Sequence, residues 1–285
     1  MRSPRSWRIS ACLLVTNRTV LPMSDWLYNL PVWWMALVIF AATYGATAAV
    51  YLVVTRLAVG ARARAFKAVS PGLLSPLGII FGLLVAFVAV GVWGDFDRAK
   101  VAVATEASAL RTAVLLAADF APEEEAQLRA LISRHITQCV NEEWHAMAEH
   151  RATLTLPPAA LIEALQRTLA LTPANDGQRT AQREIASALE SALDARRQRI
   201  IVSQSNVNSV KWAGMLLQAL CTLIAIAMVQ SNNRMACAIA MTLFATGVAL
   251  YILLIASHNR PFTGDISVGP EPLMQVIEMR PTSVP

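Results

Sequence analysis

The sequence predicts an all-α membrane protein with four transmembrane helices in two pairs and a helical extramembrane bundle inserted between the second and third. Four apolar segments contain no Asp, Glu, Lys or Arg, and each is close to the roughly 20 residues that cross a bilayer. A long polar stretch separates the two pairs. The segments are Val32 to Val54, Leu73 to Trp93, Trp212 to Val229 and Met235 to Ala256.

These segments divide the chain into five parts. We expect an N-terminal segment (1–31), the first two membrane helices (32–94), a helical extramembrane domain (95–211), the last two membrane helices (212–256) and a C-terminal tail (257–285). An even number of spans places both chain ends and the helical domain on one side of the membrane. Basic residues flank both sides, so the positive-inside rule does not decide which side is cytoplasmic.

The formal charge of +5 does not indicate a nucleic-acid partner, because four of the arginines lie within residues 1–22, which contain no acid. Without them the net charge is +1. Met23 opens an ordinary start, so we expect residues 1–22 to be a start-site artefact; a cleaved signal peptide is the alternative.

The spans contain no ionisable side chain other than tyrosine and cysteine. Charged groups inside membranes are costly and are usually retained for function. Their absence argues against a proton-coupled transporter or a voltage sensor.

Between the pairs, proline marks the starts of helices. We expect one helix over Asp97 to Asp119 that continues from the second span, and another from Pro122 to about Arg151. A third begins at Pro157 and Pro158. Asn175-Asp176-Gly177 predicts a turn. Helical spacing of Ile185, Leu189, Leu193 and Ile200 then leads toward the third span.

Three ordered motifs resemble the bacterial bestrophin-like domain family, long classed as a domain of unknown function. The first runs from Leu74 to Val88 (LSPLGIIFGLLVAFV) and leads through Val92-Trp93 to Glu106-Ala107. The second is Arg196-Arg197-x-Arg199, and the third is Pro261-Phe262-Thr263-Gly264 with Val268 and Pro270. Members usually have Asp near Asn259 and a Pro shortly before the third span, and this chain has neither.

The resemblance implies a homo-oligomer, since bestrophins are pentameric anion channels with four spans per subunit and a helical cytosolic domain. Their second span forms an apolar neck. Here Ile79, Leu83 and Phe87 follow i, i+4, i+8 spacing and are the candidate neck, which would gate by dewetting. The alternative is that these residues contact lipid or a neighbouring helix.

Other candidate residues have structural roles. Gly78, Gly82 and Ala86 form a small-xxx-small strip, which predicts close helix packing. Arg196, Arg197 and Arg199 precede the third span and are candidates for contact with lipid head groups or anions, or for interfacial anchoring. In the tail, Arg260, Pro261, Phe262 and Gly264 predict a turn that docks Phe262 against the helical domain or the bilayer interface.

One helix gathers chemistry-bearing side chains: His135, Cys139, Glu142, Glu143, His145 and Glu149. Glu142 and His145 have the spacing of a di-iron ligand pair, but no second copy exists. A solvated helix face is the favoured interpretation. We therefore expect no metal, no cofactor and, since no phosphate loop or nucleophile motif is present, no enzyme.

Two functions remain for a multi-pass protein of the bacterial inner membrane. The first is an oligomeric channel for inorganic anions, with membrane lipid and further copies of the chain as its partners. The second is a non-conducting membrane adaptor or sensor whose helical domain binds a partner. The sequence does not choose between them.

Overall fold

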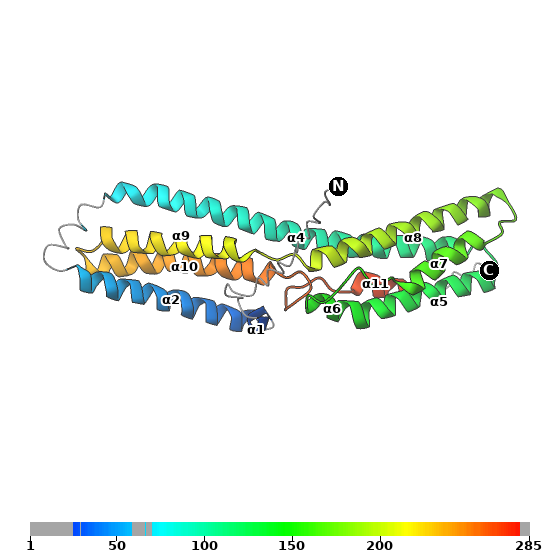
Figure 1. Cartoon of the computed structure of the whole chain (residues 1–285), viewed down its shortest axis with the longest axis horizontal. Coiled ribbons are helices and arrows are strands. Elements are labelled where there is room, and N and C mark those ends of the chain that lie inside the picture. Colours follow the sequence, from blue (N-terminus) through cyan, green and yellow to red (C-terminus); the bar gives the residue numbers. More distant parts are fainter. Residues whose placement is uncertain (1–24, 29, 59–65, 67–69, 280–285) are drawn as a thin grey trace, which may run out of the picture.

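The computed structural model describes residues 25–28, 30–58, 66 and 70–279, so the predictions about residues 1–22 lie outside it. The described residues form a long helical rod with two halves (Figure 1). In one, which we call the apolar half, α2 (Val32–Leu57), α9 (Ser209–Val229) and α10 (Arg234–His258) lie beside the first part of α4 (Leu74–Ala117). A short helix, α1 (Asp25–Tyr28), precedes α2, and a 3-10 turn, η1 (Pro71–Leu73), precedes α4.

The other half, which we call the polar half, contains the rest of α4 and the helices between the second and third apolar segments (Figure 1). These are α5 (Pro122–Gln138), a π-helical turn η2 (Cys139–Glu143), α6 (Trp144–Ala148), α7 (Ala159–Ala170) and α8 (Asp176–Ser203), with α11 (Glu271–Ile277) from the tail. The described part of the chain contains four helices long and apolar enough to cross a membrane. They coincide with the four predicted spans.

α4 joins the two halves without a break. Its 44 residues extend for about 66 Å at 1.5 Å per residue. After Gly94 its sequence is rich in alanine and contains no proline, so nothing ends the helix where the apolar segment ends. Pro122, which cannot continue a helix, then opens α5 at its first position. α4 and α8 pack along each other through the polar half.

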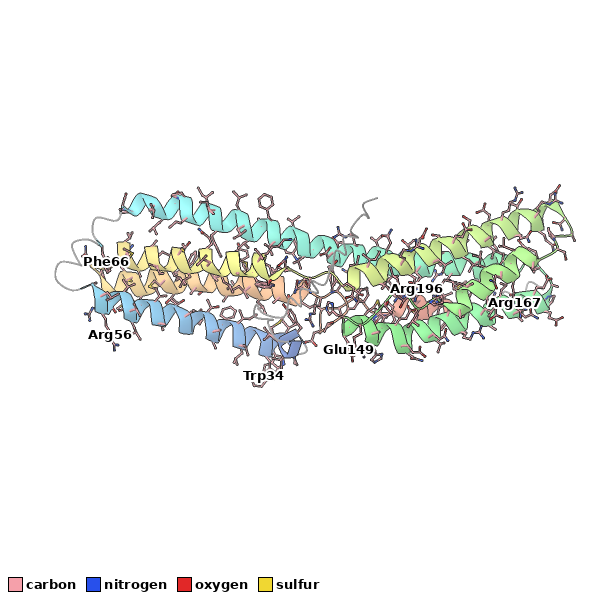
Figure 2. The ribbon with its side chains drawn as sticks, viewed as in Figure 1. Trp34, Arg56, Phe66, Glu149, Arg167 and Arg196 are labelled. Atoms are coloured by element: carbon pink, nitrogen blue, oxygen red, sulfur yellow. The ribbon has the colours of Figure 1, made fainter. Side chains whose placement is uncertain are left out.

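The apolar half has an uncharged surface with an aromatic side chain at one end and a basic side chain at the other. Trp34 lies at the end of α2 near the junction of the halves, and Arg56 lies at the far end (Figure 2). Trp34 is exposed. Aromatic and basic side chains at the ends of an apolar helix are typical of membrane interfaces.

Each half has its own hydrophobic core. In the apolar half, one face of α4 packs on α9 and α10, and this core includes Phe81, Val85, Val88, Met215, Ile252 and Ile255. In the polar half, fully buried side chains come from five helices and include Leu110, Leu128, Leu161, Leu189 and Leu273. In α8, the predicted Ile185, Leu189 and Ile200 are buried and Leu193 is partly buried.

Two local predictions differ from the structure. The expected turn at Asn175 is instead the start of α8, because the Asn175 side chain accepts a hydrogen bond from the Gln178 N–H at 2.8 Å and so caps the helix. The helix expected from Pro122 to Arg151 contains the π-helical turn η2. Such turns carry one extra residue and occur often at functional sites.

Candidate functional site

The predicted neck residues lie on the face of α4 that points away from the apolar core. Ile79, Leu83 and Phe87 are 61%, 51% and 72% exposed, whereas Phe81 and Val85 on the opposite face are buried. Unlike a surface helix of a soluble protein, which has one polar face, this part of α4 is apolar on both faces. Within one chain, therefore, the neck residues have no intrachain packing role.

The same face of α4 continues along the whole helix. At 100° per residue, eleven positions between Pro76 and Thr112 stay within about 40° of the direction of Leu83. We call this set the outer stripe; it comprises Pro76, Ile79, Leu83, Phe87, Val90, Gly94, Asp97, Val101, Thr105, Ser108 and Thr112. All are exposed except Gly94, which is half-buried.

The outer stripe changes its chemistry where α4 enters the polar half. Val101, Thr105, Ser108 and Thr112 form one side of a shallow groove of about 490 Å³, and Glu184, Ser187 and Ser191 of α8 form the other side. The stripe is therefore apolar along the uncharged span and rich in hydroxyl groups beyond it.

The small-residue strip lies beside the neck residues. Gly78, Gly82 and Ala86 are exposed, and a Cβ atom built on either glycine would meet no atom within 4 Å. No described segment of this chain packs there. Close packing between copies of the chain stays a prediction.

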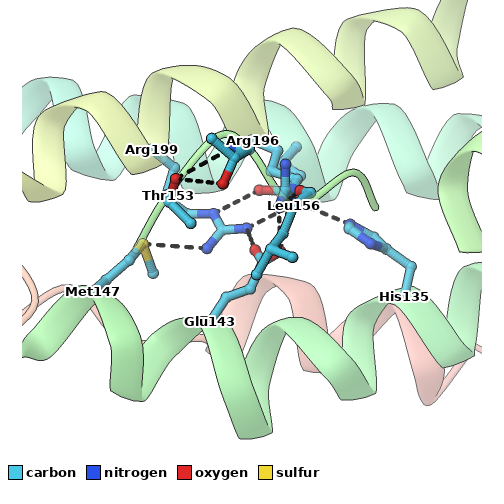
Figure 3. Close-up of polar contacts among 9 residues, drawn as sticks. His135, Glu143, Met147, Thr153, Leu156, Arg196 and Arg199 are labelled. Carbon is cyan, nitrogen blue, oxygen red and sulfur yellow. Dashed lines mark hydrogen bonds and ion pairs between the residues drawn. The ribbon is translucent and has the colours of Figure 1, made fainter. Parts of the chain in front are cut away.

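The polar half contains a buried ionic cluster. Arg199 is fully buried, and its Nε donates to Glu106 Oε2 at 2.8 Å while its Nη2 donates to Glu143 Oε2 at 3.0 Å. Glu143 Oε1 also accepts from Nε and Nη2 of Arg196, at 2.8 and 2.6 Å. Figure 3 shows the two guanidinium groups of α8 converging on Glu143, with His135 on the other side of the cluster.

The cluster balances its charge, because two carboxylates face two guanidinium groups. Burial disfavours the charged carboxylate of Glu106, yet the charge of Arg199 and hydrogen bonds from His135 and Arg199 hold its pKa below the usual value. For Glu143, burial again acts against ionisation, but Arg199 and Arg196 keep its pKa low. The cluster links α4, η2 and α8 through ionic hydrogen bonds.

This arrangement differs from the expectation of a solvated helix face. The helix carrying His135 and Cys139 does not present them as a solvated face, because both are buried. His135 Nε2 lies 3.1 Å from Glu106 Oε1, and burial raises the pKa of the Cys139 thiol. In the part of the chain that the structure describes, no three His, Cys, Asp or Glu side chains are placed to hold a metal ion.

Two residues of the basic motif before the third span lie away from the lipid head groups, anions or bilayer interface considered for them. Arg196 and Arg199 point into the polar half and are only 6% and 0% exposed. Their buried guanidinium groups are paired with carboxylates, as buried charges require. Arg197, which pairs with Asp194, is the member on the surface.

The tail motif lies at the junction of the two halves. Phe262 is buried and meets Trp144 edge-on at 5.6 Å, while Arg260 stacks over the Tyr28 ring at 4.3 Å. Pro261 accepts a hydrogen bond from Val268 N at 2.7 Å.

Gly264 adopts φ +85°, a left-handed conformation that favours glycine, and a Cβ there would lie 3.1 Å from the Tyr28 carbonyl oxygen.

Asn259 and Asp265 extend this connection into the apolar half. Buried Asn259 accepts from the Val207 N–H at 2.8 Å and donates to the Tyr28 hydroxyl at 3.1 Å. Asp265 accepts from the first N–H of α2, that of Val32, at 2.9 Å. The tail therefore joins α2, α6 and the segment before α9.

Comparison with known families identifies the chain. The model of the bestrophin-like domain matches residues 41–273. This chain belongs to the bestrophin-like domain family. The match covers all of the outer stripe, the buried cluster and the tail motif.

Solved structures support the bestrophin-like fold. A variant of a bacterial bestrophin homologue from Klebsiella pneumoniae is similar with a TM-score of 0.63 at 14% identity, covering 87% of this chain and 97% of that one. A second structure of the Klebsiella pneumoniae homologue gives a TM-score of 0.60 at 14% identity, over 86% and 98%. No curated protein matches.

Sequence reasoning missed the ionic partners in this bestrophin-like chain. Glu106 was visible as an acid in an alanine-rich helix, and Arg196 and Arg199 as basic residues three apart on another. The signal was the spacing of Glu106 among buried positions: Val103, Ala107 and Leu110 lie on the same face of α4. An acid on such a face requires a buried cation.

Proposed function

We propose that this bestrophin-like chain is one subunit of a homo-oligomeric ion channel in a cell membrane, the bacterial inner membrane, with the outer stripe of α4 lining the conduction path. The observation that carries the proposal is the outer stripe itself. It is one uninterrupted helix face that changes from apolar to hydroxyl-rich at the junction of the halves. We also propose that residues 95–211 stand outside the bilayer.

A lone subunit offers no route for ions. The core of its apolar half is built from side chains such as Val85, Met215 and Ile255, and its described residues include no Asp, Glu, Lys, Arg or His. A ring of copies would create a path on its axis instead. Gly78 and Gly82 would allow a neighbouring helix to approach closely, since glycine adds no side chain to the contact.

In such a ring the neck residues would control the path. Repeated rings of Ile79, Leu83 and Phe87 side chains form a hydrophobic constriction, which closes by excluding water rather than by physical blockage. The lipid-facing surface would then be supplied by α2 and α10.

Two measurements on the full chain test the proposal. Light scattering of the detergent-solubilised protein gives its oligomeric state, and planar bilayers give its conductance. We expect Phe87→Ala to raise the current, because a smaller side chain widens and hydrates the neck. Leu243→Ala is the matched control, since Leu243 is 70% exposed on α10 and lies outside the outer stripe.

A monomeric, electrically silent protein would contradict the proposal and favour the adaptor or sensor instead. Equal effects of Phe87→Ala and Leu243→Ala on the current would be compatible with conduction. They would contradict the assignment of the neck to the outer stripe.

A further inference from the structure

One position of the outer stripe is ionisable. Ten of its eleven residues are apolar, glycine, proline or hydroxyl-bearing, and the remaining one is Asp97. Asp97 lies ten residues beyond Phe87, about 15 Å further along the axis of α4. It therefore follows the neck at the start of the polar half.

The carboxylate of Asp97 is exposed, and none of the ion pairs among the described residues includes it. Its charged neighbours are engaged elsewhere. Asp95 and Arg98 form an ion pair with each other, and the Lys100 ammonium lies over the Phe96 ring at 4.7 Å. Among the described residues, no side chain on the adjacent turns of α4 forms an ion pair with the Asp97 carboxylate.

The groove beyond Asp97 has the same electrostatic character. Its lining contains the hydroxyl-bearing residues of α4 and α8 together with Glu184, which is exposed, and it contains no Lys or Arg. Thr112 Oγ1 donates to the Ser108 carbonyl at 3.0 Å, so its oxygen lone pairs remain available as acceptors. Oxygen acceptors and carboxylates suit cations.

The basic residues that an anion would need lie elsewhere. Arg196 and Arg199, which precede the third span, are buried in the ionic cluster with Glu106 and Glu143. Rings of Asp or Glu side chains occur in cation channels, whereas anion pores use Arg or Lys.

We propose that Asp97 determines ion selectivity: in the assembled ring its copies form a band of carboxylates below the neck that admits cations and rejects anions. This inference rests on the proposed function, because it requires the outer stripe to face the axis of a conducting oligomer. It differs from the anion selectivity that the family resemblance implies. The permeant ions would be hydrated inorganic monovalent cations.

The test is the reversal potential of the full-length protein in planar bilayers under a KCl gradient. We expect the wild-type reversal potential to lie close to the equilibrium potential of K⁺ and far from that of Cl⁻. Asp97→Asn removes the charge while preserving shape, and should shift the potential toward that of Cl⁻. Asp97 is exposed and makes no ion pair within the described chain. The variant should therefore fold and assemble normally, and elute from a size-exclusion column at the wild-type volume.

Asp95→Asn is the matched control, because it makes the same change two residues away, at a position about 160° around the helix from Asp97. We expect the control to keep the wild-type potential. A Cl⁻-selective wild type, or equal shifts of the reversal potential in Asp97→Asn and Asp95→Asn, would overturn the inference about Asp97. Either result would leave the proposed ion conduction intact. Absence of current in the wild type would overturn conduction and selectivity together.

Discussion

Replacement of Glu106 by glutamine tests whether the ionic cluster holds the polar half together. The substitution keeps the size of the side chain but removes a charge from a residue that is fully buried. Glu106 accepts from Arg199 at 2.8 and 3.3 Å and lies 3.1 Å from His135 Nε2. In the variant, the Arg199 guanidinium retains Glu143 as its carboxylate partner.

The expected cost is large. Two unit charges about 4 Å apart attract by about 4 kcal/mol at an effective dielectric constant near 20. Removing one partner of a buried pair costs about 3 to 5 kcal/mol, because the other charge stays buried. Since Arg199 retains Glu143 as a partner, we expect the lower end of this range. At about 2 to 4 °C per kcal/mol for a chain of this size, we expect Glu106→Gln to lower Tm by at least about 6 °C.

Thermal unfolding in detergent, followed by tryptophan fluorescence, measures this effect, since Trp144 stacks on Arg199 at 5.0 Å. Glu163→Gln is the control, because Glu163 forms only exposed ion pairs with Arg134 and Arg167. Such exposed pairs are screened by solvent and contribute little to stability. Equal Tm values for the two variants would refute the role assigned to the cluster.

Three further predictions concern pH, the tail and assembly. Glu106 and Glu143 have pKa values below those of the unfolded chain, so the stability they contribute is present above the unfolded value near 4.3 and is lost as pH falls through the folded values. A plot of Tm against pH should show this loss at acidic pH. The fall in Tm should be shallower in Glu106→Gln. Gly264→Ala should destabilise the junction by about 1 to 3 kcal/mol because of its positive φ, and unchanged Tm would contradict this. Gly82→Leu should reduce the oligomer mass in light scattering, whereas Gly247→Leu, equally free of neighbours but on α10, should not; equal masses would exclude packing at the strip.

Much of the fold follows from local patterns in the chain. The four spans were predictable because length and absence of charge decide whether a helix can cross a bilayer. The continuation of the second span into the polar half was also predictable, since no helix breaker occurs between Gly94 and Pro122. The turn expected at Asn175 was wrong because the same residues cap a helix and form a turn, and only the following chain distinguishes the two.

The candidate site divides in the same way. The sequence by itself placed Ile79, Leu83 and Phe87 on one face of one helix, because helical periodicity alone determines that. Only the tertiary structure decided that this face is the one left uncovered, and that Arg199 points inward to Glu106 rather than outward to lipid. Both depend on which side of α4 and α8 meets the other helices. Contacts between residues 93 apart in the chain are set by packing of the whole bundle, and no local pattern encodes them.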